Sequence, residues 1–251
     1  MRIDHPTGAE ISGLRLLWKE AFDDTDAFLD DFFSSGFAPE RCLYAGEGGT
    51  VAAALYWFRC SCGDRRFAYL YALATKKSHR GQGLARRLVE EAAAELKDRG
   101  CSGILLVPGE PALFDMYRKL GFGDTLYADS FTAEADGAPV PVRQVEAEAY
   151  ARLRRAALPS GGVVQEGENL SFLSTFAGLY AGDGWLLAGS LEEDIFSGME
   201  FRGDRSAVPG ILKALGAKRG TFRTPGEGRP FAQYRSLDGT PAPRYFGLAF
   251  D

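Results

Sequence analysis

One loop of this chain combines residue types that can hold a phosphate. A strand predicted over Phe67–Thr75 runs into a loop with glycines at Gly81 and Gly83, and a helix is predicted to begin at about Leu84. The first N–H groups of a helix have no intrahelical partner and lie at the positive end of its dipole. Glycines let that backbone approach a bulky anion closely, so the loop predicts a phosphate site. A lone Gly-x-Gly is also common in ordinary strand-to-helix turns, and by itself it does not decide the matter.

The local charge supports an anionic ligand. The chain carries a net charge of −5, yet residues 65–89 contain seven basic side chains and no acidic one. A cationic stretch inside an acidic protein favours a polyanion close to the loop. These basic residues are Arg65, Arg66, Lys76, Lys77, Arg80, Arg86 and Arg87.

Two motifs resemble those of the GNAT acetyltransferases. Arg80-x-x-Gly83-x-Ala85 is similar to the family signature Q/R-x-x-G-x-G/A, and it stands between a long strand and a long helix as the family has it. Downstream, Leu113-Phe-Asp-Met-Tyr117-Arg-Lys-Leu-Gly121-Phe122 looks like the second motif, A-x-x-x-Y-x-x-x-G-F. The resemblance covers roughly residues 8–130. It departs from the family at Glu110, where Asn is frequent, and at Leu113, where Ala is frequent, which puts contacts to the pantetheine arm in doubt.

The resemblance implies acetyl-CoA as cosubstrate and an N-acetyltransferase reaction. The pantetheine arm would pair with the exposed edge of the strand at Leu73, Ala74 and Thr75. Tyr117 matches the tyrosine that protonates the leaving sulfur, and a phenol with an ordinary pKa of about 10 keeps its proton at neutral pH. The pyrophosphate would rest on the loop backbone, formed by Arg80, Gly81, Gln82, Gly83, Leu84 and Ala85.

The general base is the least determined part of the site. A lysine-like amine with a pKa of about 10.4 must lose its proton before it attacks, at a cost of about 4.6 kcal/mol at pH 7. The strand Tyr69–Leu73 lacks the acidic residue that many relatives carry there. Glu110 is one candidate, although capping of the following helix is the favoured interpretation for it. The other candidate is the C-terminal carboxylate of Asp251, because two-domain relatives of the enhanced-intracellular-survival type use their chain terminus in this way.

The apolar patterns predict an α/β (α+β) fold in the first half, with a parallel pair of strands in a mixed sheet. The resemblance implies the GNAT form of this fold, a mixed, mostly antiparallel sheet whose central parallel pair is splayed, with flanking helices. Domain 1–136 would hold acetyl-CoA. Domain 137–251 would be a second, smaller α+β half, a degenerate GNAT-like copy without coenzyme, since its comparable junction reads Phe201-Arg-Gly203-Asp204-Arg-Ser206. Further expected elements are helices over 11–22, 84–99, 111–120, 145–157, 168–180 and 206–215, strands over 41–45, 51–60, 103–107, 185–189 and 195–201, and three short strands near Thr221, Tyr234 and Phe246.

The bulk properties narrow the function further. The four cysteines and two histidines are too few for a disulfide framework or for a metal site at Cys60-Ser-Cys62, so no metal is expected. Charge distribution argues against nucleic acid as a partner, and the absence of a long apolar run or a signal-peptide pattern predicts a cytoplasmic protein without membrane contact. The acceptor would be the primary amine of a small molecule or peptide. A homo-oligomer, transfer of a longer acyl group and a non-catalytic acetyl-CoA sensor remain open alternatives.

Overall fold

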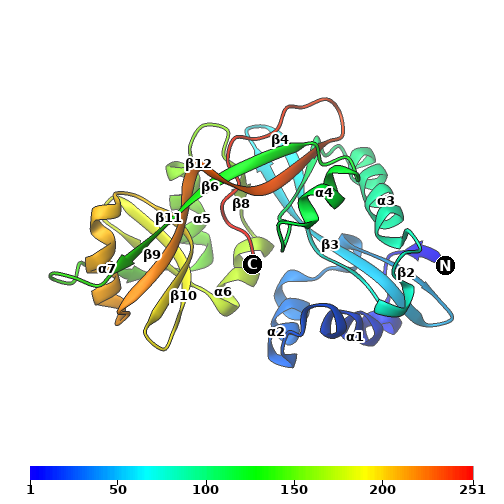
Figure 1. Cartoon of the computed structure of the whole chain (residues 1–251), viewed down its shortest axis with the longest axis horizontal. Coiled ribbons are helices and arrows are strands. Elements are labelled where there is room, and N and C mark those ends of the chain that lie inside the picture. Colours follow the sequence, from blue (N-terminus) through cyan, green and yellow to red (C-terminus); the bar gives the residue numbers. More distant parts are fainter. Residues whose placement is uncertain (251) are drawn as a thin grey trace. The chain divides into compact units, whose positions relative to one another are not determined.

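The structure is a computed structural model that describes residues 1–250, and Asp251 lies outside the described residues. The chain forms two compact units (Figure 1). The first contains Met1–Asp124 and Gln233–Ala242, and the second contains Thr125–Ala232 and the residues from Pro243 onward. This partition differs from the predicted boundary at residue 136, because the end of the long strand β12 pairs with a strand of the first unit.

The first unit is built on a mixed sheet of five strands and the end of a sixth. The strand order is β1-β2-β3-β4-β5-β12. All neighbouring pairs are antiparallel except β4 and β5, which are parallel, as the splayed-pair prediction requires. The strands are β1 (Arg2–Asp4), β2 (Cys42–Glu47), β3 (Thr50–Cys62), β4 (Arg65–Thr75), β5 (Gly103–Leu106) and β12 (Arg219–Ser236).

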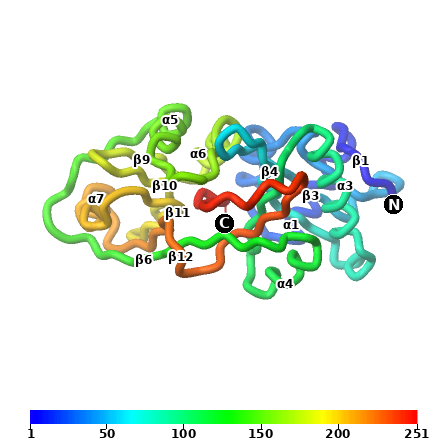
Figure 2. Tube along the Cα trace, turned by 90° about the horizontal axis from the view of Figure 1, so that it is seen from above, coloured from blue at the N-terminus to red at the C-terminus, as the bar shows by residue number. Residues whose placement is uncertain are grey.

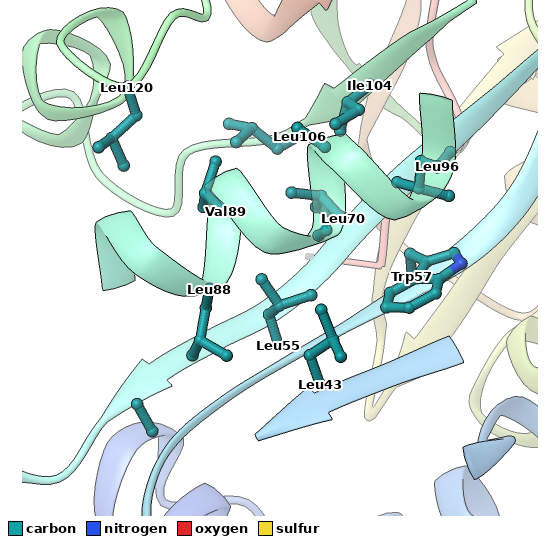
Figure 3. Packing of buried hydrophobic residues seen from close by; sticks show 14 of the residues in the cluster. Leu43, Leu55, Trp57, Leu70, Leu88, Val89, Leu96, Ile104, Leu106 and Leu120 are labelled. Atoms are coloured by element: carbon teal, nitrogen blue, oxygen red, sulfur yellow. The ribbon is translucent and has the colours of Figure 1, made fainter. Parts of the chain in front are cut away.

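Helices cover both faces of this sheet, and the alternation of side chains along the strands shows why. Leu55 and Trp57 of β3 and Leu70 of β4 point toward the helix α3, where they join Leu88 and other α3 side chains in one core (Figure 3). Tyr56 and Tyr71, which are their neighbours along the strands, point to the opposite face and pack against Trp18 of α1. The helices are α1 (Ile11–Phe22), α2 (Asp26–Asp31), α3 (Leu84–Asp98) and α4 (Leu113–Arg118).

The strands of the second unit pair in the order β7-β9-β10-β11-β12. Within this unit β6 also pairs with β12, and Figure 2 shows the two traces side by side. A core of its own gathers Trp185, Phe196, Phe201 and Phe222 beneath α7. The strands are β6 (Asp124–Glu134), β7 (Arg143–Gln144), β8 (Val164–Gln165), β9 (Gly178–Gly182), β10 (Trp185–Glu192) and β11 (Ile195–Arg202), and the helices are α5 (Ala147–Ala157), α6 (Glu168–Phe176) and α7 (Val208–Leu215).

The two units repeat one topology. In the first, two helices precede three antiparallel strands, then a helix, then a strand parallel to the third. In the second, α5 and α6 precede β9, β10 and β11, which are followed by α7 and by β12 parallel to β11. Even the short edge strands correspond, because β1 pairs with β2 and β7 pairs with β9. The element order predicted from the sequence for the second half is therefore close to the observed one.

Several predicted elements differ from the structure. The helix expected over 168–180 ends at Phe176, and Gly178–Gly182 is a strand, because the apolar pattern continues across the junction. The helix expected over 111–120 is shorter, Leu113–Arg118. The strands expected near Thr221 and Tyr234 are one continuous strand, β12, and Phe246 lies in no regular element.

Candidate active site

The glycine turn of the first unit leaves the start of α3 without a side-chain cap. Gly81 and Gly83 have φ angles of 77° and 73°, and no atom lies within 4 Å of the position that a Cβ would take at either residue. Gly83 is the N-cap residue of α3, and no side-chain hydrogen bond caps this helix end. Most other residue types at this position would fill the space or cap the helix themselves. The turn thus presents bare backbone at the positive end of the helix.

The strand leading into this turn has an exposed backbone edge. β4 pairs with β5 from Phe67↔Gly103 to Leu70↔Leu106, where β5 ends, so Tyr71–Thr75 extends beyond its neighbour. A bulge stands at the same place, because the register with β3 shifts between Ala54 and Tyr56. Ala72 within the bulge has a φ of 49°, a left-handed conformation that is costly for alanine. Strain of this kind is concentrated at functional sites.

A pocket of about 410 Å³ lies where this edge, the glycine turn and α4 meet. It brings together nine of the residues that the sequence singled out, although their roles stay predictions. Gln82 and Glu110 are not among the described residues that line it. The nine are Leu73, Ala74, Thr75, Arg80, Gly81, Gly83, Leu84, Ala85 and Tyr117.

Tyr117 enters the pocket from α4 with most of its side chain buried. Only 9% of the residue is exposed, and its ring packs edge-on against Phe122 with centroids 5.9 Å apart. The Tyr117 carbonyl accepts hydrogen bonds from the N–H groups of Leu120 and Phe122 at 2.9 and 3.1 Å. These hydrogen bonds end the helix, and the chain turns at Gly121. Burial raises the pKa of Tyr117 to about 12. The phenol consequently keeps its proton across the neutral range and can donate it, or a hydrogen bond, to a developing anion in the pocket.

The pocket also contains residues that sequence reasoning missed. Phe22 at the end of α1 and Met116 on α4 are large apolar side chains, 43% and 37% exposed, and both line the pocket. His79 lines it as well, with its Nδ1 2.9 Å from the Ser78 hydroxyl. Nearby, the Glu20 carboxylate accepts a hydrogen bond from the Lys77 N–H at 2.6 Å and so ties α1 to the loop. Of these residues only Phe22 had a signal in the sequence, its position on the apolar side of the first predicted helix.

The basic stretch is gathered around the turn except at its start. Arg65 and Arg66 open β4, whereas the turn follows Thr75 at the other end of this strand. At about 3.3 Å per residue the two ends are roughly 30 Å apart. The other five basic residues lie between the end of β4 and the first turn of α3, and they are Lys76, Lys77, Arg80, Arg86 and Arg87.

The structure describes one of the two candidate bases, Glu110, and this residue does not line the pocket. Glu110 is exposed, and the part of it that contacts α4 is its backbone carbonyl, which accepts a hydrogen bond from the Leu113 N–H at 3.0 Å. Ala112 is the N-cap residue of this helix and no side chain caps it, so the expected capping role of the Glu110 side chain is wrong. Asp251 lies outside the described residues.

Within residues 1–250 no three or more His, Cys, Asp and Glu side chains are grouped to hold a metal ion. Cys60 and Cys62 are free thiols. Among the same residues no helix combines the length and apolar character needed to cross a membrane.

Comparison with known proteins assigns the first unit. Residues 11–122 match the Acetyltransferase (GNAT) family, a range that includes the pocket, the glycine turn and Tyr117. The first unit is a GNAT domain. Thialysine N-epsilon-acetyltransferase of Bos taurus is 30% identical over 83 residues, which are 32% of this chain and 49% of that protein. The chain thus spans about half the length of the curated relative it matches.

Solved structures extend the likeness in fold to both units. A GCN5-related N-acetyltransferase from Anabaena variabilis matches 94% of this chain and 72% of its own with a TM-score of 0.72 and 14% identity. One from Kribbella flavida matches 94% and 71% with a TM-score of 0.68 and 17% identity. Eis1 from Mycobacterium abscessus matches 95% and 74% with a TM-score of 0.67 and 14% identity. At these identities the likeness establishes the fold alone, a mixed α/β GNAT fold.

Proposed function

We propose that the chain is an N-acetyltransferase that transfers the acetyl group of acetyl-CoA to a primary amine by direct attack on the thioester. The observation that carries the proposal is the meeting of an uncapped glycine turn, a free strand edge and a buried, protonated tyrosine around one pocket. Acetyl-CoA carries phosphates at one end, an amide-rich arm in the middle and a thioester at the other. The three parts of the pocket match these three chemistries in order.

The residues of the turn would hold the pyrophosphate. No side chain caps the start of α3, nothing lies within 4 Å of a Cβ at Gly81 or Gly83, and Arg80 beside them adds positive charge. The edge of β4 from Leu73 to Thr75 offers peptide groups to the amides of the pantetheine arm. One N–H there would also polarise the acetyl carbonyl, since donors fixed in advance stabilise the charge that develops on that oxygen.

Tyr117 would act on the departing sulfur. As the amine attacks, negative charge grows on the thiolate, and a hydrogen bond from the phenol strengthens with that charge. A pKa of about 12 ensures that the proton is present at neutral pH. General acid groups typically contribute 10²–10⁴-fold to the rate. The amine itself is a small-molecule or peptide acceptor, and its base is not assigned.

The test follows free thiol release from acetyl-CoA with a panel of amines, in wild type and Tyr117→Phe. The panel includes thialysine and lysine, because thialysine is named in the bovine relative. We expect amine-dependent release in wild type and a fall of about 100-fold in kcat for Tyr117→Phe, with little change in acetyl-CoA affinity.

Tyr44→Phe is the matched control, since Tyr44 lies on β2 in the same unit and away from the pocket. It should keep wild-type kcat. Tight acetyl-CoA binding without release by any amine would favour a non-catalytic sensor instead. A protein that does not bind acetyl-CoA would refute the proposal.

A further inference from the structure

The end of β12, the last strand of the second repeat, completes the sheet of the first unit. The last residues of β12 pair antiparallel with β5, from Gln233↔Leu106 to Ser236↔Gly103. These residues belong to the first unit although more than 100 positions separate them from α4 in the sequence. The end of β12 therefore lies next to β5, the strand that leads toward α4. Its side chains can then contact that helix directly.

Gln233 contacts both ends of the segment that carries Tyr117. The side chain is fully buried, and its Nε2 donates hydrogen bonds to the Phe114 carbonyl at 3.2 Å and to the Phe122 carbonyl at 3.1 Å. Phe114 lies in the first turn of α4, and Phe122 lies just beyond its end. Tyr117 stands between the two. One amide group thus connects the first turn of α4 to the residues that follow the helix.

Arg235 holds the same segment from its exposed side. Its Nη1 donates to the Leu120 carbonyl at 3.0 Å, and its guanidinium forms an ion pair with Glu90 of α3 at 2.8 Å. The Arg235 side chain packs against Gly121, where a Cβ would stand 3.2 Å from it. Arg235 in this way connects the end of α4 to α3.

α4 needs such external contacts because it has only six residues. Helices this short are not stable alone, since nucleation costs more than the few hydrogen bonds return. Its first turn has no side-chain cap either. The position of Tyr117 must accordingly be set by what α4 packs against and is hydrogen-bonded to.

We propose that Gln233, assisted by Arg235, is a positioning residue for Tyr117: it clamps α4 so that the phenol faces the pocket. The inference rests on the proposed function for the catalytic role of Tyr117. It adds that the reaction of the first unit depends on the end of β12, the strand that closes the second repeat.

The test combines Gln233→Met with Tyr117→Phe in a double-mutant cycle. Methionine keeps the length and volume of the side chain but donates no hydrogen bond. We expect Gln233→Met to lower kcat at least tenfold in the wild-type background and less than twofold when Tyr117 is already Phe, because a clamp that acts through Tyr117 has nothing left to position. Equal factors in the two backgrounds would overturn the proposal and leave Gln233 a merely structural role.

Tyr234→Phe is the matched control. Tyr234 is the next residue of β12, but its hydroxyl bonds to the Ser102 and Thr240 carbonyls rather than to α4. It should change kcat less than twofold in both backgrounds. Arg235→Met is the second variant if Gln233→Met does not fold, since its side chain is partly exposed, and the same non-additivity with Tyr117→Phe is expected.

Hydrogen exchange supplies a readout that does not depend on activity. In Gln233→Met the amides of Leu120 and Phe122 should exchange at least tenfold faster, while those of β3 and β4 keep their wild-type rates. Unchanged exchange of these two amides would overturn the clamp even if the protein is an acetyltransferase. Absence of turnover in wild type would instead refute the proposed function. The exchange rates of the Leu120 and Phe122 amides would still show whether Gln233 holds α4 in place.

Discussion

The two units place a strand-to-helix junction at the same point of one topology, but the junctions differ in what they present. In the first unit Gly83 precedes α3, and no side chain caps the helix. In the second unit Asp204 stands at the junction, and its carboxylate accepts a hydrogen bond from the Ser206 N–H at 2.9 Å. That hydrogen bond lowers the pKa of Asp204 below its ordinary value. A carboxylate therefore occupies the region where the first unit leaves room for a phosphate.

The parallel strands separate at the same point in both units, but in the second unit a side chain bridges the gap. β11 pairs with β12 only from Ile195↔Arg219 to Gly198↔Phe222, so Met199–Arg202 extends beyond the pair as Tyr71–Thr75 does in the first unit. Here Arg223 bridges the opening, with its Nη1 donating to the Met199 carbonyl at 3.1 Å and to the Gly247 carbonyl at 3.2 Å.

A buried ionic network lies next to Met199, on the part of β11 that extends beyond the pair. Arg154 of α5 donates to the Glu200 carboxylate at 2.5 and 2.9 Å, and the Tyr245 hydroxyl donates to it at 2.9 Å. Burial alone would raise the pKa of Glu200, but the charge of Arg154 and these hydrogen bonds bring it below its ordinary value. Tyr245 and Gly247 thereby hold the part of β11 that extends beyond the pair, through Glu200 and Arg223. The comparison teaches that the topology creates a binding position twice, and that a few side chains decide whether the position stays open.

The largest effect expected from this comparison is on the stability of the second unit. Arg154→Met removes one partner of the buried pair and should lower the free energy of unfolding by about 3–5 kcal/mol, because Glu200 would remain buried and unpaired. Denaturant unfolding measures it. Arg155→Met is the control, since this neighbouring arginine pairs with Glu166 at the surface, and the change should stay below about 1 kcal/mol. A similar small effect for Arg154→Met would show that the network does not hold the second unit together.

The next effect is on coenzyme binding by the first unit. Gly83→Asp gives α3 the carboxylate that the second unit has, and the left-handed φ of 73° is tolerated by aspartate. Acetyl-CoA affinity should fall at least 100-fold, about 2.7 kcal/mol. Gly48→Asp in the hairpin turn of the same unit, with a φ of 58° and open space around it, is the control for backbone strain and should bind as wild type does. Unchanged affinity in Gly83→Asp would mean that the turn does not hold the pyrophosphate.

The smallest effect is the reverse change. Asp204→Ala removes the cap at the second junction and should lower the melting temperature by about 2–4 °C. It should not create a coenzyme site, because Arg223 and Tyr245 still form hydrogen bonds to the part of β11 that extends beyond the pair. A second bound acetyl-CoA in this variant would show that the cap alone closes the second unit.

Much of the site followed from the sequence because its signals are local. Gly81, Gly83 and Leu84 stand within four positions, and Tyr117 precedes Gly121 in one short segment. Each of these patterns specifies a backbone conformation without reference to the rest of the chain. The pocket that the structure shows is lined by most of the residues that these patterns singled out.

The missed features depend on distant contacts. Nothing near Gln233 in the sequence indicates that it hydrogen-bonds to Phe114 and Phe122. The bulge at Ala72 lies inside an apolar run that looks like an uninterrupted strand. Likewise Pro225 and Pro230, which usually interrupt strands, lie within the 18 residues of β12. Register and pairing partners of this kind are set by tertiary packing rather than by local preference.

The most direct test of the account is the stoichiometry of acetyl-CoA binding, measured by titration calorimetry on the full chain. We predict one acetyl-CoA per chain in wild type, one in Asp204→Ala, and no measurable binding at the same concentrations in Gly83→Asp. Two molecules per wild-type chain, or full binding in Gly83→Asp, would contradict the claim that one junction is open and the other closed.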